Sequence, residues 1–105
     1  MRRYGSTDTH LLSAVAVGQI TADPATGHVA YKGKPVGRVY PDGRVLIDVP
    51  RTDRPGTVTI AAHRIVWTCC VAPIPDGMTI RHRNGHRWDN RLSNLELATP
   101  SRRRG

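Results

Sequence analysis

Turn signals recur at short intervals between residues 18 and 62 of this chain. The strongest is Asp42-Gly43, because Asp-Gly between two apolar runs is typical of a β-hairpin. A turn at residues 23–27 contains both proline and glycine, and Lys32-Gly33-Lys34 marks another. We therefore predict a β-rich region with an exposed loop near residues 51–56 and strands at residues 19–21, 28–31, 37–40, 44–47 and 57–62.

Two helices are expected, one on each side of the β-rich region. Residues 6–18 begin with helix-capping side chains and continue with apolar residues at helical spacing, which predicts a short helix. A strand through residues 15–17 is the competing interpretation. Residues 63–72 predict a second helix, which Pro73 and Pro75 end, because proline cannot continue a helix.

The apolar content of the chain sets limits on its class. The 105 residues include no phenylalanine, so the core depends on Val, Ile, Leu and Ala, and we expect modest stability. No segment approaches the roughly 20 apolar residues of a membrane span, and no signal-peptide h-region is present. Cys69 and Cys70 are adjacent, which suits neither an ordinary disulfide nor a zinc knuckle. We expect them to be buried in a protein of the reducing cytoplasm.

Arginine dominates the charge of the chain. The sequence has 16 Lys and Arg residues against 8 Asp and Glu, a net charge of +8, and 14 of the 16 are arginine. The planar guanidinium group suits phosphate, so this bias favours a nucleic-acid partner. The alternative is an ordinary basic surface. From residue 79 onward there are seven arginines against two acidic residues, which places most of the surplus charge near the motif described next.

The stretch from Ile80 to Glu96 is the most informative part of the sequence for function. His82 closes a short apolar segment, Asn84-Gly85 makes a turn, and Asn94 stands twelve residues beyond the histidine. Strands are expected on both sides of this stretch, at residues 79–82 and 95–99.

The ordered set of segments "AAHRIVW", "IPDGMTIRHRNG" and "DNRLSNLELAT" resembles the HNH endonuclease family of the phage and homing type. The resemblance covers roughly residues 18–101. It implies an α+β fold, in which an N-terminal β-hairpin region is followed by a helix and a ββα-metal (HNH) unit with a truncated closing helix. The expected divisions are a basic tail with a short helix (1–17) and a single HNH-like domain (18–105), made of a β-rich part (18–62), a helix (63–72) and the HNH motif (79–105).

The resemblance also implies roles for individual residues. His82 matches the motif histidine, a general base that takes a proton from the attacking water. Asn94 matches the middle asparagine, which braces the loop and orients the histidine. His63 and Asn90 are expected to be structural, although Asn90 and Arg91 read equally well as ordinary solvated loop residues. The expected nucleic-acid-binding residues are Arg64, Arg81, Arg83, Arg87, Trp88, Arg91, Arg102, Arg103 and Arg104.

Two arginines stand where the family has metal ligands. Arg81 precedes the motif histidine, and Arg103 occupies the position of the third ligand on the closing helix. A hard ion such as Mg²⁺ needs oxygen ligands, and a guanidinium about 4 Å away would repel a divalent ion by roughly 8 kcal/mol at an effective dielectric of about 20. His86 and Asp89 are candidate substitute metal ligands.

Two functions therefore remain open from the sequence. The first is a small endonuclease that cleaves DNA with Mg²⁺ or Mn²⁺ and without a structural zinc. The second is a degenerate, catalytically inactive HNH fold that acts as a nucleic-acid or nucleoprotein binding module. Double-stranded DNA is the favoured partner in either case, and a homodimer or a protein partner is left open. The expected location is the cytoplasm of a bacterial or phage-infected host cell.

Overall fold

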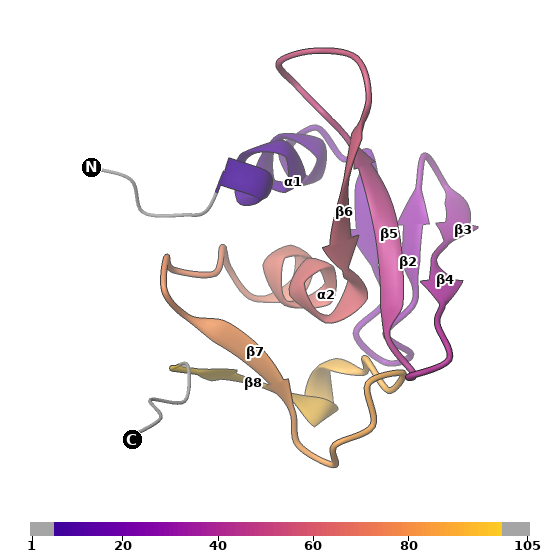
Figure 1. The fold of residues 1–105 in the computed structure, drawn as a ribbon, viewed down its shortest axis with the longest axis vertical. Helices are drawn as coiled ribbons and strands as arrows, with labels where there is room; N and C mark the ends of the chain where they lie inside the picture. Colours follow the sequence, from indigo (N-terminus) through magenta and orange to yellow (C-terminus); the bar gives the residue numbers. More distant parts are fainter. Residues whose placement is uncertain (1–5, 100–105) are drawn as a thin grey trace.

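The computed structural model describes residues 6–99 of the chain, and its α+β architecture confirms the fold class expected from the sequence (Figure 1). The elements in chain order are α1 (Ser6–Ala16), β1 (Ile20–Ala22), β2 (Val29–Tyr31), β3 (Lys34–Val36), β4 (Arg38–Val39), β5 (Val45–Pro50), β6 (Thr57–Ala61), α2 (Ala62–Cys70), β7 (Thr79–His82), the 3₁₀ turn η1 (Leu92–Asn94) and β8 (Leu95–Ala98).

The strands form three small antiparallel sheets, in the orders β1-β2-β3, β4-β5-β6 and β7-β8. The hairpin turns at residues 32–33 and 42–43 are those predicted from the sequence, whereas strand β3 was not predicted, and Lys34, expected in the turn, begins it. Lys32 and Gly33 join β2 to β3 with φ angles of 51° and 82°, which is the left-handed geometry of a tight hairpin turn. At the Asp42-Gly43 turn, Tyr40 N–H donates to the Arg44 carbonyl at 2.8 Å, which closes the hairpin between β4 and β5.

Helix α2 is the centre of the hydrophobic core. Ala62, Ile65 and Val66 are buried on it, at the spacing that places side chains on one helix face. The helix packs against α1, β1, β5, β6 and β7, so all three sheets surround it (Figure 1). It ends at Cys70, ahead of Pro73, as the sequence predicts.

Helix α1 shares this core. Leu11 and Ala14 are buried and belong to the same apolar cluster as the residues of α2, so the helical interpretation of the first segment is confirmed. The division of the chain at residues 17 and 18 stays a prediction. Among residues 6–99 there is no helix long and apolar enough to cross a membrane.

The two cysteines are free and only partly buried, less so than the sequence predicts. The Sγ atoms of Cys69 and Cys70 lie 3.8 and 3.9 Å from the carbonyl oxygens of Ile20 and Ala22. Burial raises the pKa of the Cys69 thiol to about 11. Both side chains therefore pack α2 against β1 as neutral groups.

The β7–β8 hairpin brings the motif histidine to the core. Ile80 and Leu95 are buried, and Ile80 and His82 share one strand face because side chains alternate along a strand. Arg81 lies on the other face, opposite Glu96 of β8. The closing helix expected after residue 100 lies outside the described residues.

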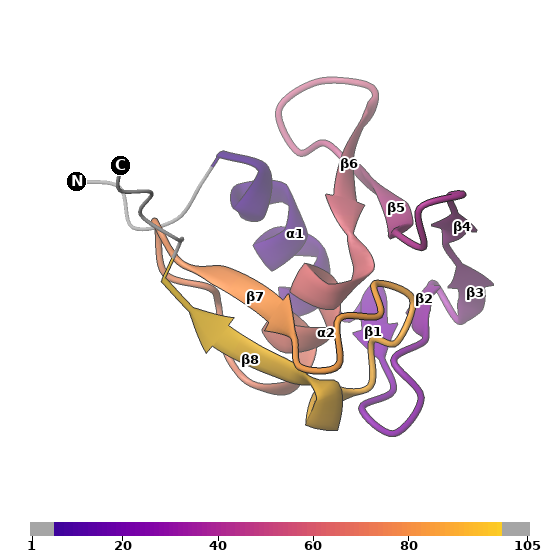
Figure 2. The ribbon, with the colours of Figure 1, turned by 60° about the horizontal axis from the view of Figure 1, so that its bottom comes forward.

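A close backbone contact ties the N-terminal hairpins to the loop after β7. Gly27 has a φ of 79°, and a Cβ built on it would lie 2.6 Å or less from three backbone atoms of Asn90 and Arg91. Leu92 N–H also donates to the Pro24 carbonyl at 2.9 Å. Figure 2 shows this loop passing beside β1 and β2. Only a glycine at position 27 permits this approach.

Replacing Gly27 by alanine should destabilise the protein far more than the same change at Gly33. Both glycines have φ angles near 80°, so both variants carry about 1 kcal/mol of left-handed strain. Only the new Cβ at position 27 meets backbone, whereas nothing lies within 4 Å at position 33. Urea unfolding followed by tryptophan fluorescence should give a loss of about 3 kcal/mol or more for Gly27→Ala. Equal losses in the two variants would contradict the close contact.

Candidate functional site

The loop of residues 83–91, which follows β7, is held by the side chain of Asn94. The Asn94 Oδ1 atom accepts the Asn84 backbone N–H at 3.1 Å. Its Nδ2 group donates to Asn84 Oδ1 and to the Asp89 carbonyl, both at 2.9 Å. Asn94 is buried and therefore braces both ends of the loop. Sequence reasoning read Asn84 only as part of an Asn-Gly turn and missed this pairing.

Asp89 is the second anchor of the loop. Its side chain is buried and accepts hydrogen bonds from Arg91 Nε at 2.8 Å, Arg91 Nη2 at 2.7 Å and Asn84 Nδ2 at 3.0 Å. The hydrogen bonds from Arg91, followed by the one from Asn84, hold the pKa of Asp89 well below its usual range. Asp89 is thus a permanent anion whose two oxygens are already engaged.

His82 is oriented by Asn90, not by Asn94. The His82 Nε2 and Asn90 Oδ1 atoms are 2.8 Å apart, and a carboxamide oxygen can only accept a hydrogen bond. Nε2 therefore donates its N–H to Asn90, and in the neutral ring the lone pair is on Nδ1. Asn90 is 3% exposed, which contradicts its interpretation as a solvated loop residue. The sequence assigned the orienting role to Asn94, because spacing alone does not show which asparagine reaches the ring.

His63, at the start of α2, lies against His82. The two ring centroids are 4.8 Å apart with the planes at 61°. Burial lowers the pKa of His63 to about 4, with smaller contributions from His82 and Arg64. His63 is therefore a neutral imidazole near pH 7 and places no positive charge beside the ring of His82.

The two histidines line a cavity of about 350 Å³ between β5, α2 and β7. Three arginines line the same cavity, Arg44, Arg81 and Arg87, although the guanidinium of Arg81 is paired with Glu96 on the opposite face of β7. Arg81 and Arg87 are among the expected nucleic-acid-binding residues. Sequence reasoning missed Arg44, although its place directly after the Asp42-Gly43 turn was visible. A cavity with this lining favours an anion.

Of the other expected nucleic-acid-binding residues, Arg83 and Arg91 pair with carboxylates, and neither of them lines this cavity. Arg81 and Arg83 both pair with Glu96, the latter at 3.2 Å. Trp88 is 58% exposed, as expected, and its ring stacks on that of His86 with centroids 5.1 Å apart. Arg64 directly follows His63 on α2. Arg102, Arg103 and Arg104 lie outside the described residues.

The described residues do not fit a three-ligand metal site. Residues 6–99 contain no group of three His, Cys, Asp or Glu side chains placed to hold an ion. The nearby carboxylates, Asp89 and Glu96, are both occupied by arginine, and His86 is stacked on Trp88. His86 and Asp89 were predicted to replace the metal ligands of the family. That prediction is untested, and the contacts of the two side chains do not support it.

Comparisons with known proteins agree on one relationship. Residues 61–104 match the family model described as HNH endonuclease. A 62-residue segment is 32% identical to a protein of Bacillus subtilis (strain 168) whose name reads "SPbeta prophage-derived putative HNH homing endonuclease YosQ". The match covers 59% of this chain and 35% of that protein.

The fold is similar to that of the HNH homing endonuclease I-HmuI, in a solved structure that describes DNA binding and cleavage by that enzyme. The TM-score is 0.62 at 24% sequence identity, over 78% of this chain and 47% of the other. The chain thus spans about a third of the length of YosQ and about half that of I-HmuI.

The buried imidazole of His63 should make the protein lose stability in mild acid. Its folded pKa of about 4 lies below the ordinary value of 6.5, so the unfolded chain takes up the proton first. Stability is complete above pH 6.5 and is lost as the pH falls towards 4, by roughly 2–3 kcal/mol at pH 4.5. Urea unfolding of wild type and His63→Gln at several pH values between 7.5 and 4.5 measures this loss of unfolding free energy. If the unfolding free energy of His63→Gln fell as steeply with decreasing pH as that of wild type, the loss could not be attributed to the buried imidazole of His63.

Proposed function

We propose that this chain, whose residues 61–104 match the HNH endonuclease family model, is a member of that family that binds nucleic acid and hydrolyses its phosphodiester bonds. One observation carries the proposal: His82, whose Nε2 is held by Asn90, borders a cavity that Arg44 and Arg87 also line. A general base and a site for an anionic phosphate are two of the parts that metal-assisted hydrolysis requires.

The substrate we favour is double-stranded DNA. The solved structure of I-HmuI describes DNA binding and cleavage by that enzyme, and arginine is the most abundant charged residue of this chain. Since this chain spans about half of I-HmuI, its substrate and activity are part of the proposal. A homodimer, a protein partner and a cytoplasmic location stay predictions.

The reaction assigned to the site is attack of water on phosphorus. His82 Nδ1 takes a proton from the water, whose oxygen forms a bond to phosphorus while the bond to the leaving oxygen breaks. The leaving oxygen takes its proton from solvent. The arginines of the cavity bind the phosphate and stabilise the negative charge that builds up on its oxygens. Asn90 and Asn94 act as positioning residues, through the imidazole and the loop respectively.

Mg²⁺ or Mn²⁺ is the cofactor that we propose for hydrolysis. Such an ion would stabilise the charge of the phosphate and of the leaving oxygen. The oxygens of Asp89 and Glu96 are held by arginine, so no described residue is assigned as a ligand and no step is assigned to the ion. The inactive binding module is the less favoured alternative, because the family and both relatives are named as endonucleases.

Nucleic-acid binding should depend steeply on salt. If about five phosphate contacts form, the logarithm of the association constant should fall with the logarithm of salt concentration at a slope near roughly −4.5. Fluorescence anisotropy with a labelled DNA duplex should then show an affinity loss of a few hundredfold between about 50 and 200 mM salt. A flat dependence, or no binding at the lowest salt, contradicts the proposal.

Cleavage should require His82 and a divalent ion. His82→Ala should lower the rate of plasmid nicking by about two to four orders of magnitude, because the general base is lost. Binding of the same DNA should change little, since His82 supplies none of the arginine charge. EDTA should abolish the wild-type reaction. Equal nicking by wild type and His82→Ala, from identically purified protein, would locate the activity elsewhere.

A further inference from the structure

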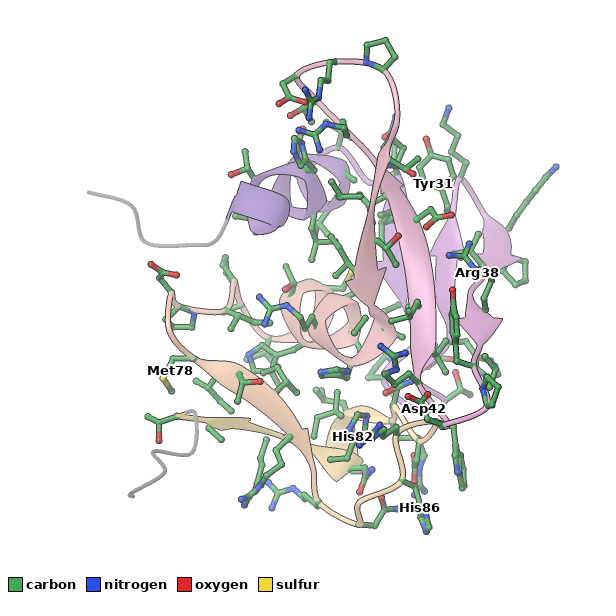
Figure 3. All side chains as sticks on the ribbon, in the orientation of Figure 1. Tyr31, Arg38, Asp42, Met78, His82 and His86 are labelled. Carbon is green, nitrogen blue, oxygen red and sulfur yellow. The ribbon has the colours of Figure 1, made fainter. Side chains whose placement is uncertain are left out.

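The tip of the β4–β5 hairpin rests on the loop that follows β7. A Cβ built on Gly43 would lie 3.5 Å from Trp88 Cδ1 and 3.7 Å from Arg87 Cβ, which is ordinary packing distance. Figure 3 shows Asp42 beside the segment that carries His82 and His86. The hairpin tip lies outside the residues that match the HNH family, 61–104.

One carboxylate at this tip holds two arginines from different segments. Asp42 Oδ2 accepts from Arg44 Nε at 2.7 Å and from Arg87 Nη1 at 3.4 Å. The Arg44 guanidinium also lies over the Tyr40 ring, 5.5 Å from its centroid. Hydrogen bonds to Arg44 keep the pKa of Asp42 below its ordinary value. The carboxylate is therefore charged at neutral pH.

Both of these arginines border the cavity that contains His63 and His82. A guanidinium has five N–H donors, and each of the two arginines uses a single side-chain nitrogen on Asp42. Most donors of Arg44 and Arg87 therefore remain for a ligand, and both side chains are at least half exposed. Two forked donors from separate segments that line one cavity match the oxygens of a phosphodiester.

We propose that Arg44 and Arg87 form a two-segment clamp for a phosphodiester group beside His82, and that Asp42 positions both guanidinium groups. The clamp rests on the proposed function, which it deepens by adding residues from outside the family-matched part of the chain. Asp42 acts through the two arginines and does not itself bind the phosphate.

The role of Asp42 gives a prediction whose sign is unusual. If Asp42 contributed only charge, Asp42→Asn would remove a negative charge near the cavity and tighten phosphate binding. If Asp42 positions the clamp, the same change weakens binding, because both guanidinium groups lose their fixed orientation. Asp48 offers the matched control, since it forms a similar pair with Arg38 at 2.7 Å on the same β4–β5 ribbon. Neither Arg38 nor Asp48 lines the cavity.

Dimethyl phosphate, a minimal phosphodiester, can be titrated against the full chain while the imidazole resonances of His63 and His82 are followed by NMR. Wild type should bind with a dissociation constant in the millimolar range. Arg44→Ala should weaken binding about fivefold or more, and Arg44→Lys should recover only part, because an ammonium lacks the planar fork. Asp42→Asn should weaken it about threefold, whereas Arg38→Ala and Asp48→Asn should change it by less than about twofold.

The result that overturns the clamp is equal binding by Arg44→Ala and Arg38→Ala, tighter binding by Asp42→Asn, or no imidazole shift in wild type up to about 100 mM ligand. The amide spectra of the variants report folding in the same experiment. DNA nicking assays keep the two proposals distinct. If wild type nicks DNA and Arg44→Ala nicks it equally well, only the clamp is refuted. If phosphate binding depends on Arg44 but wild type does not nick DNA, only the proposed hydrolysis is refuted.

Discussion

The site depends on the carboxamide of Asn94. A loop without regular secondary structure must find partners for its backbone polar groups elsewhere, and Asn94 supplies three hydrogen bonds to the loop that follows β7. That loop delivers Asn90 to the imidazole of His82, Arg87 to the cavity and Asp89 to its buried position. One amide, held by the buried start of β8, thus determines where the partner of the His82 ring, part of the arginine lining and the buried Asp89 lie.

The acidic residues near the cavity orient arginine side chains but neutralise only part of their positive charge. Asp42 holds Arg44 and Arg87, Glu96 holds Arg81 and Arg83, and Asp89 holds Arg91. Three carboxylates thereby orient five guanidinium groups, and the net charge of the group stays positive. Exposed pairs of this kind contribute little to stability. Their value lies in direction, since a flexible arginine that is already oriented loses less entropy when it binds a phosphate.

The sequence predicted the parts of the fold that depend on neighbouring residues. The Asp42-Gly43 turn and the proline after α2 act within a few positions, so the hairpins and the helix were identifiable. The site depends on contacts between distant segments, such as Gly27 under Asn90 and Asp42 against Arg87. Such contacts follow from packing, which spacing does not encode. The exchange of roles between Asn90 and Asn94 has the same cause, because both precede β8 within a few residues.

The contact at Gly27 determines how far the segment that carries His82 and Asn90 can be separated from the rest of the chain. The family match begins at residue 61, yet the loop that carries Asn90 rests on the β1–β2 turn, and Leu92 N–H donates to Pro24. A fragment that began at residue 61 would retain His82 but would lose the β1–β2 turn, against which the backbone of Asn90 packs. In a chimera of HNH proteins, the first hairpin and the motif would therefore have to be exchanged together, whereas the exposed loop between β5 and β6 offers a freer point of insertion.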